Sequence, residues 1–195
     1  MMPMLGTGFR SAAVTRVGVM VTFLRMERAP DAPPPPLPDG AVIQRVAAPT
    51  VAFYRYLYNT VGAEYVWWLR RTMADADLAA LLRYPGVSVH VLYVGGAPAG
   101  FCELDGRPAP EMNLSYFGLL PHAVGMGIGG LFLRHAVAEM WGRAPRALTV
   151  NTCTADHPRA LPTYLRTGFR VMRAVAEVWD VPVALGLQIP DRLKV

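Results

Sequence analysis

The sequence is poor in the residues that mark secreted or metal-binding proteins. Only two of its 195 residues are cysteines, Cys102 and Cys153, and neither stands in a Cys/His spacing typical of metal ligands. Charged residues make up 17% of the chain and apolar residues 53%, a balance that argues against a disordered protein. The composition therefore predicts two buried, reduced thiols, no metal site and a cytoplasmic location.

Long apolar runs are also missing. No run reaches the roughly 18–20 residues that cross a bilayer, so we expect no membrane partner. The best candidate, Val17–Leu24, has eight residues and follows two arginines, as in a secretory signal. The charged segment 25–30 comes next instead of a small-residue cleavage site, which disfavours secretion.

A basic stripe is absent despite the net charge of +5. The arginines are scattered singly and are not interleaved with aromatic residues, so we expect no nucleic-acid partner. Separate arginines can still form a local cationic rim for a phosphorylated ligand.

The chain divides into an N-terminal region and one domain. Residues 1–16 carry no periodic apolar pattern and are expected to be a disordered extension. Residues 17–40 add an extra strand, Val21–Glu27, and a proline-rich connector whose fixed φ angles favour an extended spacer. The domain then covers residues 41–195, long enough to bury its own core.

Within the domain, apolar periodicity predicts a mixed α/β sheet. The order is strand, two helices, three strands, helix, strand, helix, strand. The expected strands are 41–47, two hairpin strands on either side of Gly95-Gly96, 112–120, 147–153 and 169–181; the expected helices lie within 49–71, 75–84, 129–141 and 157–168.

Four glycines stand within six residues, where a predicted strand ends and a helix begins: Gly125, Gly127, Gly129 and Gly130. The first N–H groups of a helix have no internal partner and carry its positive dipole end, so such a turn binds anions, phosphate above all. A P-loop is excluded because no lysine follows, and a Rossmann fingerprint does not fit this spacing so late in the chain. A tight turn that binds no ligand is the alternative.

A second block, residues 156–170, spaces Ala160, Tyr164 and Gly168-Phe169 at intervals of four. Together with GLLPHAVGMGIGG (residues 118–130) it resembles the GNAT superfamily of acyl-CoA N-acyltransferases. Members carry V-x-P, then [RQ]-x-x-G-x-[GA], then N-x-x-A-x-x-x-Y-x-x-x-G-F, and the resemblance covers about residues 41–180. It implies one GNAT-like domain with a mixed, mostly antiparallel twisted sheet of about six to seven strands and about four helices.

The resemblance also implies acetyl-CoA as the cofactor and an enzyme that transfers its acetyl group. Tyr164 would be the general acid for the CoA thiolate, with a packed core aromatic as the alternative. Leu119 and Leu120 would bond the pantetheine arm through their backbone, as an added strand does. The other cofactor-binding residues implied are Val124, Gly125, Met126, Gly127, Ile128, Gly129, Gly130, His157 and Ala160.

Three positions depart from the family pattern. Val124 replaces the arginine or glutamine that often opens the loop, which removes one charge-assisted phosphate contact. His157 replaces the asparagine of the second block and either contacts the cofactor or caps the helix. Pro162 lies where a helix interior needs an N–H, so we expect an irregular helix start that becomes regular near Tyr164.

The sequence offers several candidates for the general base and for the residues that contact the acceptor. Many relatives use a glutamate on the fourth strand as the base, and the matching residue is Asn113, which cannot take a proton. Glu103 and Glu111 are the remaining carboxylates considered, and a water chain through Asn113 is the alternative. Tyr65 and Trp67 are candidate acceptor contacts.

The acceptor itself is expected to be a small-molecule or protein amine, and the resemblance admits a homodimer. A non-catalytic acyl-CoA-binding regulatory or scaffold module is the second hypothesis. Retention of Tyr164 favours the enzyme.

Overall fold

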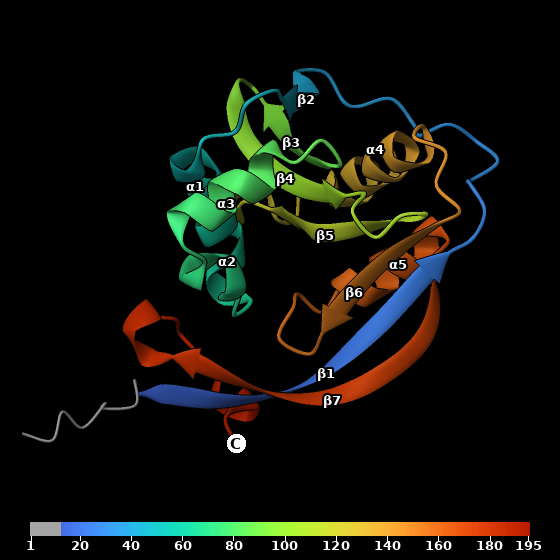
Figure 1. The fold of residues 1–195 in the computed structure, drawn as a ribbon. Helices are drawn as coiled ribbons and strands as arrows, with labels where there is room; N and C mark the ends of the chain where they lie inside the picture. The colour runs from blue at the N-terminus through green and yellow to red at the C-terminus, as the bar shows by residue number, and fades with distance from the viewer. Residues whose placement is uncertain (1–12) are drawn as a thin grey trace, which may run out of the picture.

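A seven-stranded sheet runs through the whole molecule (Figure 1). The computed structural model describes residues 13–195. Its strand order is β2-β3-β4-β5-β6-β1-β7, and every neighbouring pair is antiparallel except β5 and β6. The strands are β1 (Val14–Met26), β2 (Ala41–Val46), β3 (Val87–Val94), β4 (Ala97–Asp105), β5 (Glu111–Leu119), β6 (Ala147–Cys153) and β7 (Arg170–Pro182).

Helices cover both faces of this sheet. Among the described residues the α-helices are α1 (Val51–Val61), α2 (Leu69–Thr72), α3 (Asp75–Arg83), α4 (Gly129–Trp141) and α5 (Ala160–Thr167). The prediction of an α/β fold with a mixed, mostly antiparallel sheet is confirmed.

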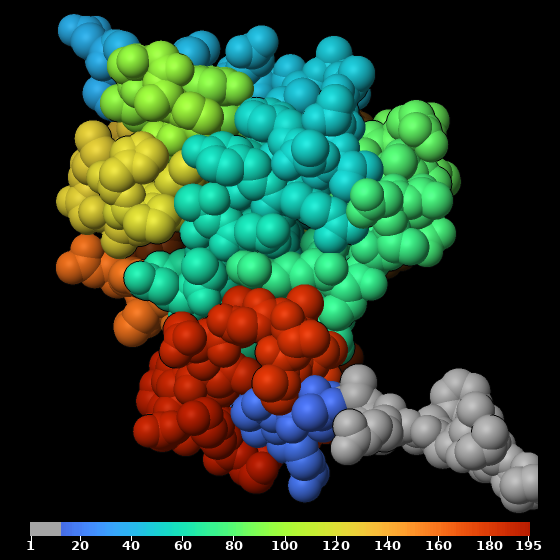
Figure 2. Space-filling view, turned by 90° about the vertical axis from the view of Figure 1, so that its left-hand side faces the viewer, coloured from blue at the N-terminus to red at the C-terminus, as the bar shows by residue number. Residues whose placement is uncertain are grey.

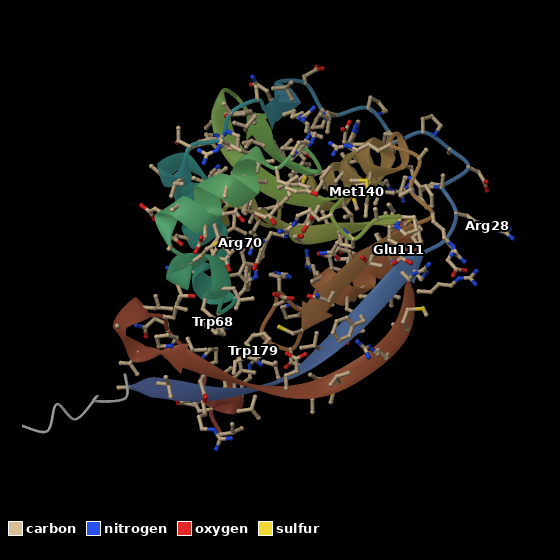
Figure 3. All side chains as sticks on the ribbon, viewed as in Figure 1. Arg28, Trp68, Arg70, Glu111, Met140 and Trp179 are labelled. Atoms are coloured by element: carbon tan, nitrogen blue, oxygen red, sulfur yellow. The ribbon has the colours of Figure 1, made fainter. Side chains whose placement is uncertain are left out.

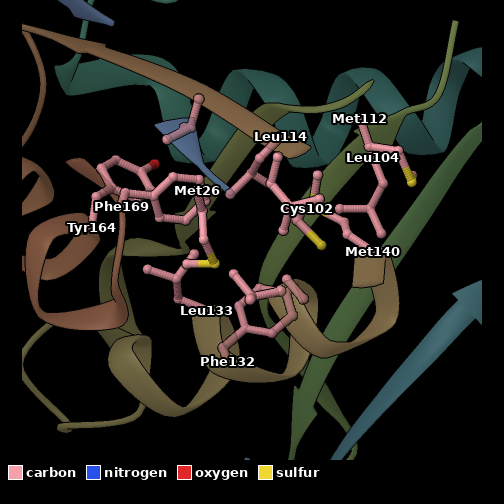
Figure 4. Close-up of a cluster of buried hydrophobic side chains, with 14 of the residues drawn as sticks. Met26, Cys102, Leu104, Met112, Leu114, Phe132, Leu133, Met140, Tyr164 and Phe169 are labelled. Atoms are coloured by element: carbon pink, nitrogen blue, oxygen red, sulfur yellow. The ribbon is translucent and has the colours of Figure 1, made fainter. Parts of the chain in front are cut away.

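Side-chain alternation along the strands divides the core between the two faces. On β4, Phe101 packs with α1 and α3, whereas the neighbouring Cys102 packs with α4 and α5. Figure 4 shows the second of these clusters, in which Phe132 and Leu133 from α4 meet Tyr164 from α5. Each face therefore has its own apolar core, and the sheet supplies residues to both.

The first strand differs from the sequence prediction. A strand was expected over Val21–Glu27, outside the domain proper, but β1 begins at Val14 and lies between β6 and β7 (Figure 1). Residues 14–16, assigned to the disordered extension, pair with β7, and residues 1–12 lie outside the described residues. The reason is long-range pairing: β1 bonds to strands more than 120 residues later, which local periodicity cannot reveal.

Because β1 is flanked on both sides, its buried side chains should matter for stability. Leu24 is 1% exposed, and Leu24→Ala is expected to lower the free energy of unfolding by about 2–5 kcal/mol. Val14→Ala, at a position 45% exposed on the same strand, is the matched control and should change it by less than about 1 kcal/mol. Chemical denaturation of both variants measures the free energy of unfolding. A loss in Leu24→Ala no larger than that in Val14→Ala would show that Leu24 contributes little to the packing of the core.

The helix expected within 49–71 is interrupted in the structure. α1 ends at Val61, and Gly62 opens a 3-10 turn over Gly62–Glu64. A Cβ atom on Gly62 would collide with the Trp67 side chain, and Val66 has a positive φ of 57°. The chain therefore folds back here and carries an aromatic loop, residues 65–68, towards the centre of the sheet.

Candidate functional site

The sheet opens between β5 and β6. The two strands pair only at Glu111–Leu114 with Ala147–Val150, and β5 then contains an irregularity around Ser115 before it runs on to Leu119. A cavity of about 950 Å³ lies at this opening. It extends from the glycine turn before α4 to β7 on the far side.

The glycine turn forms one wall of this cavity. Gly125 and Gly127 have φ angles of +91° and +76°, a conformation that glycine adopts at little cost. Gly129 and Gly130 are the first residues of α4, and all four glycines line the cavity. Within residues 13–195, their N–H groups donate no hydrogen bond. The turn thus presents a set of free donors at a helix start, as predicted.

The two residues predicted to bond the pantetheine arm, Leu119 and Leu120, differ in where their backbone groups point. The N–H of Leu120 donates to Ala99 on β4 and its C=O accepts from Ala123, so both backbone groups are used. Because successive residues of a strand point to opposite edges, the backbone of Leu119 points away from β4, into the opening. Leu119 lines the cavity and Leu120 does not, so the structure leaves Leu119 as the better placed of the two for the predicted contact.

Two further predicted cofactor contacts lie outside the cavity lining. Ile128 is buried in the core under α4, and Met126 is exposed on the outer side of the turn. Val124, by contrast, lines the cavity.

Positive charge stands near the glycine turn although Val124 supplies none. Arg134 on α4, Arg159 before α5 and Arg166 on α5 all line the cavity. They form the local cationic rim that the scattered arginines suggested.

Tyr164 lies on α5, where the helix faces the opened strands. Its side chain lines the cavity and packs edge-on against Phe117 and Phe169. Burial, reinforced by the negative charge of Asp156, raises the pKa of Tyr164 well above its usual value of 10. Burial therefore favours the protonated form of this phenol.

The start of α5 is more regular than expected. The helix begins at Ala160, which lines the cavity, and Pro162 falls in its first turn. A helix needs no N–H there, so Pro162 fits. His157 accepts a hydrogen bond from the Arg159 N–H at Nδ1, 3.1 Å away, while its ring packs against Tyr65 in the cavity wall. This bond is to the residue before the helix, and no side chain caps the first turn of α5, so both roles of His157, as a cofactor contact and as a cap, stay predictions.

The opposite end of the cavity is aromatic. The loop after α1 contributes Tyr65, Trp67 and Trp68, and β7 contributes Trp179. Trp67 packs against Tyr58 and Tyr116. Figure 3 shows Trp68 and Trp179 in the gap between α2 and β7, and Figure 2 shows the C-terminal segment packed below the helical layer. Tyr65 and Trp67 therefore lie where the acceptor contacts were predicted.

The two glutamates considered as bases lie away from the cavity lining. Glu103 is fully buried and pairs with Arg70 at 2.7 Å, and it also accepts a hydrogen bond from the Tyr54 hydroxyl. Glu111 pairs with Arg25 of β1 at 2.5 Å. Both carboxylates are held in ion pairs, so the structure does not bring them to the reacting centre.

Asn113 does line the cavity, but as a hydrogen-bonded amide. Its Nδ2 donates to Ser115, and its Oδ1 accepts from Thr149, each at 3.1 Å. The polar chain through Asn113 and Ser115 is therefore present in the cavity wall.

Asp156 is a carboxylate in the cavity that the sequence did not single out. It accepts hydrogen bonds from Thr152 at 2.7 Å, from the N–H of Cys153 at 2.9 Å and from Trp67 at 3.3 Å. Burial is the main cause of the raised pKa values of Tyr164 and Tyr65, and the charge of Asp156 adds to both. Its position next to His157, at the strand–helix junction, was the available signal.

Of the two thiols predicted to be buried, only Cys102 is fully so. Cys102 is buried and Cys153 half-buried, both are free, and burial raises the pKa of Cys153 to about 12. No metal-ligand cluster of three or more side chains occurs in residues 13–195. In the same part of the chain no helix has the length and apolarity needed to span a membrane.

Comparison with known proteins supports the assignment of fold and family. The model of the acetyltransferase (GNAT) family matches residues 54–169. No curated protein matches the chain.

Solved structures share the fold at low sequence identity. An IAA acetyltransferase from Bacillus cereus has a TM-score of 0.51 and 24% identity, over 68% of this chain and 79% of its own. GCN5-related N-acetyltransferases from Sphaerobacter thermophilus and Kribbella flavida have TM-scores of 0.53 and 0.56 and identities of 18% and 15%. Those two matches cover 88% and 89% of this chain but only 53% and 63% of the longer relatives.

Proposed function

Because this chain belongs to the acetyltransferase (GNAT) family, we propose that it transfers an acetyl group from acetyl-CoA to an amine by direct attack. The observation that carries the proposal is one cavity with free N–H groups at the glycine turn and a protonated, buried Tyr164 on the facing helix. A phosphate-binding turn alone would suit many ligands. The added phenol, set between that turn and an aromatic pocket, fits thioester chemistry.

The residues present fit the cofactor. The N–H groups of Gly125, Gly127, Gly129 and Gly130 would hold the pyrophosphate, and the arginine rim would replace the charge missing at Val124. The outward-facing backbone of Leu119 would bond the pantetheine arm in the opening between β5 and β6. Acetyl-CoA would supply the activated acetyl thioester.

The chain's own groups would then handle two protons. Tyr164 would donate its hydroxyl proton to the departing sulfur as the carbon–sulfur bond breaks, and it would regain a proton from the newly acetylated nitrogen, directly or through water. Asp156 would hold the acceptor's ammonium group and take up its proton, directly or through water. Asp156 already accepts three hydrogen bonds, which fix its carboxylate in place, and its other lone pairs remain available.

The aromatic end of the cavity supports a proposal for the class of acceptor. Tyr65, Trp67, Trp68 and Trp179 present apolar surface with a carboxylate beside it, an arrangement suited to an amine with an apolar or aromatic body. Such an amine can be a small molecule or the amine of a protein side chain. A thioester-cleavage assay with a panel of amines, from short alkylamines to arylalkylamines, tests this proposal and is expected to favour the latter. No acyl transfer to any amine, with acetyl-CoA still bound, would favour the binding-module alternative.

Cofactor binding at the glycine turn can be tested at Gly130. No heavy atom lies within 4 Å of a Cβ added there, and Gly130 lines the cavity. Gly130→Val should therefore leave the fold intact but place methyl groups where phosphate binds. We expect acetyl-CoA affinity, measured by calorimetry, to fall at least about tenfold, a loss of roughly 1.4 kcal/mol.

Ala80→Val is the matched control for that experiment. Ala80 is an exposed residue of α3 that does not line the cavity, so Ala80→Val creates the same β-branched side chain at another exposed helical position. Its affinity for acetyl-CoA should equal that of the unmodified protein. Unchanged affinity in Gly130→Val would rule out the glycine turn as the pyrophosphate site.

A further inference from the structure

β7 ends the sheet with a long unpaired edge. Its 13 residues pair only with β1 among the described strands, and Figure 1 shows no strand on its outer side. The N–H of Val183 donates to the C=O of Ala13, and bonding alternates along an antiparallel pair. The odd-numbered residues of β7 therefore bond to β1, and Ala174, Ala176 and Val178 direct their N–H and C=O groups outward.

This edge is also unusually apolar for an exposed strand. Val171, Met172, Val175 and Val178 are all exposed, Val178 at 53%. Long, exposed edges of this kind pair readily with another strand. A bulge at Met172 marks the limit of the regular part, since Phe23 pairs with Arg173 and Leu24 with Val171.

The charges along β7 are complementary to those of a second β7 that runs in the opposite direction. Residues 170–180 read RVMRAVAEVWD, and Val175 is their centre. Around it, Ala174 mirrors Ala176, Arg173 mirrors Glu177, and at the ends Arg170 mirrors Asp180. Every basic residue in the segment thus has an acidic counterpart at the same distance on the other side.

We propose that β7 pairs antiparallel with β7 of a second copy of this chain, about a two-fold axis at Val175. In this register Ala174 of each copy faces the partner's Ala176, and these outward-facing residues exchange backbone hydrogen bonds. Arg173 faces the partner's Glu177 in a non-hydrogen-bonded pair, where side chains approach most closely. The regular segment 173–177, free of the bulge, supplies both ion pairs.

Two observations favour a second copy over another partner. The basic and acidic residues of β7 stand opposite each other when two copies of the strand run antiparallel. A two-fold interface requires such self-complementarity, whereas a strand of another protein does not. In residues 13–195, Arg173 has no ion-pair partner; its guanidinium lies over the Phe23 ring, 4.6 Å from the centroid. Among the described residues, Glu177 accepts a hydrogen bond only from Trp179, at 2.8 Å, so it has room for the partner's Arg173.

Some residues of the proposed interface also line the cavity. Glu177 and Trp179 line its far end, and Phe23, which lies under Arg173, lines it too. Each copy would therefore place an arginine beside the aromatic end of the other copy's cavity. This interface does not depend on the proposed acetyl transfer, since it concerns the outer edge of the sheet.

The test is the mass of the full-length chain in solution, measured by light scattering over a concentration series. The unmodified protein should have twice the mass of one chain. Arg173→Glu or Glu177→Arg places like charges opposite each other at two positions per interface, so each should weaken the dimer at least about tenfold. The double variant Arg173→Glu/Glu177→Arg restores both pairs in reverse and should restore the dimer. Arg45→Glu, on the opposite edge strand β2, is the charge-matched control and should remain dimeric.

A backbone variant separates edge pairing from side-chain effects. Ala176→Pro removes an outward N–H but leaves bonding to β1 intact, because Ala176 points away from β1. It should be a monomer with an unchanged melting temperature. A monomer at all concentrations for the unmodified chain, dimers that persist in both single charge variants, or a double variant that stays monomeric would each overturn the proposal.

Discussion

Tyr164→Phe is expected to lower the turnover rate by about 10²–10⁴, the usual effect of removing a general acid. The ring and its packing against Phe117 and Phe169 are kept, and only the proton donor is lost. The Michaelis constant for acetyl-CoA should change little because the glycine turn and Leu119 are unaffected. Steady-state kinetics with varied acetyl-CoA separates the two constants.

The pH profile provides a second readout for Tyr164. Burial and the charge of Asp156 raise its pKa well above 10, so the donor stays protonated as the pH rises. If the protein catalyses the proposed transfer, its rate should therefore show no loss from tyrosine ionisation up to about pH 10. A Phe variant with the original turnover would make Tyr164 a core aromatic, and combined loss of rate and cofactor affinity would make its hydroxyl a binding contact.

Asp156→Asn is expected to lower the turnover rate at neutral pH by at least about 10²-fold, because the amide cannot take the acceptor's proton. The deficit should shrink as the pH approaches the pKa of the amine, since the free amine then needs no base. Loss of the hydrogen bonds from Thr152 and Cys153 should also cost about 1–3 kcal/mol of stability. Rates measured from pH 6 to 10, at a temperature well below unfolding, test the chemical role.

Asp77→Asn is the control for that series, since Asp77 is exposed on α3 and remote from the cavity. Its pH profile should match that of the unmodified enzyme. A rate deficit in Asp156→Asn that stays constant across the whole pH range would mean that Asp156 only positions the loop before α5.

The parts of the fold and site that could be predicted depend on short-range patterns. The glycine turn lies in the motif at residues 118–130, and Tyr164 lies in the motif at residues 156–170. Each motif is a short local pattern, and the structure brings both to one cavity. The sheet class followed in the same way from the order of apolar segments. The predicted roles of these residues in binding and catalysis await the experiments above.

What could not be predicted depends on contacts between distant segments. Glu103 looked like an available carboxylate because nothing near it in sequence shows that Arg70 and Tyr54 occupy it. Asp156 was not a candidate in the sequence because its contact with Trp67 joins residues 89 positions apart. The break after Val61 was hidden for another reason: it depends on the Trp67 side chain packing onto Gly62, a local contact that apolar periodicity does not reveal.

The position of β1 has a consequence for how the chain reaches this structure. Val21 lies opposite Cys153 on one side and Val175 on the other, so the earliest strand is completed only by the last ones. Contacts of such wide sequence separation slow folding, because the intervening chain must be ordered before they form. During synthesis β1 would remain without its partners until β7 has left the ribosome, and its apolar residues would be exposed to chaperones for nearly all of that time.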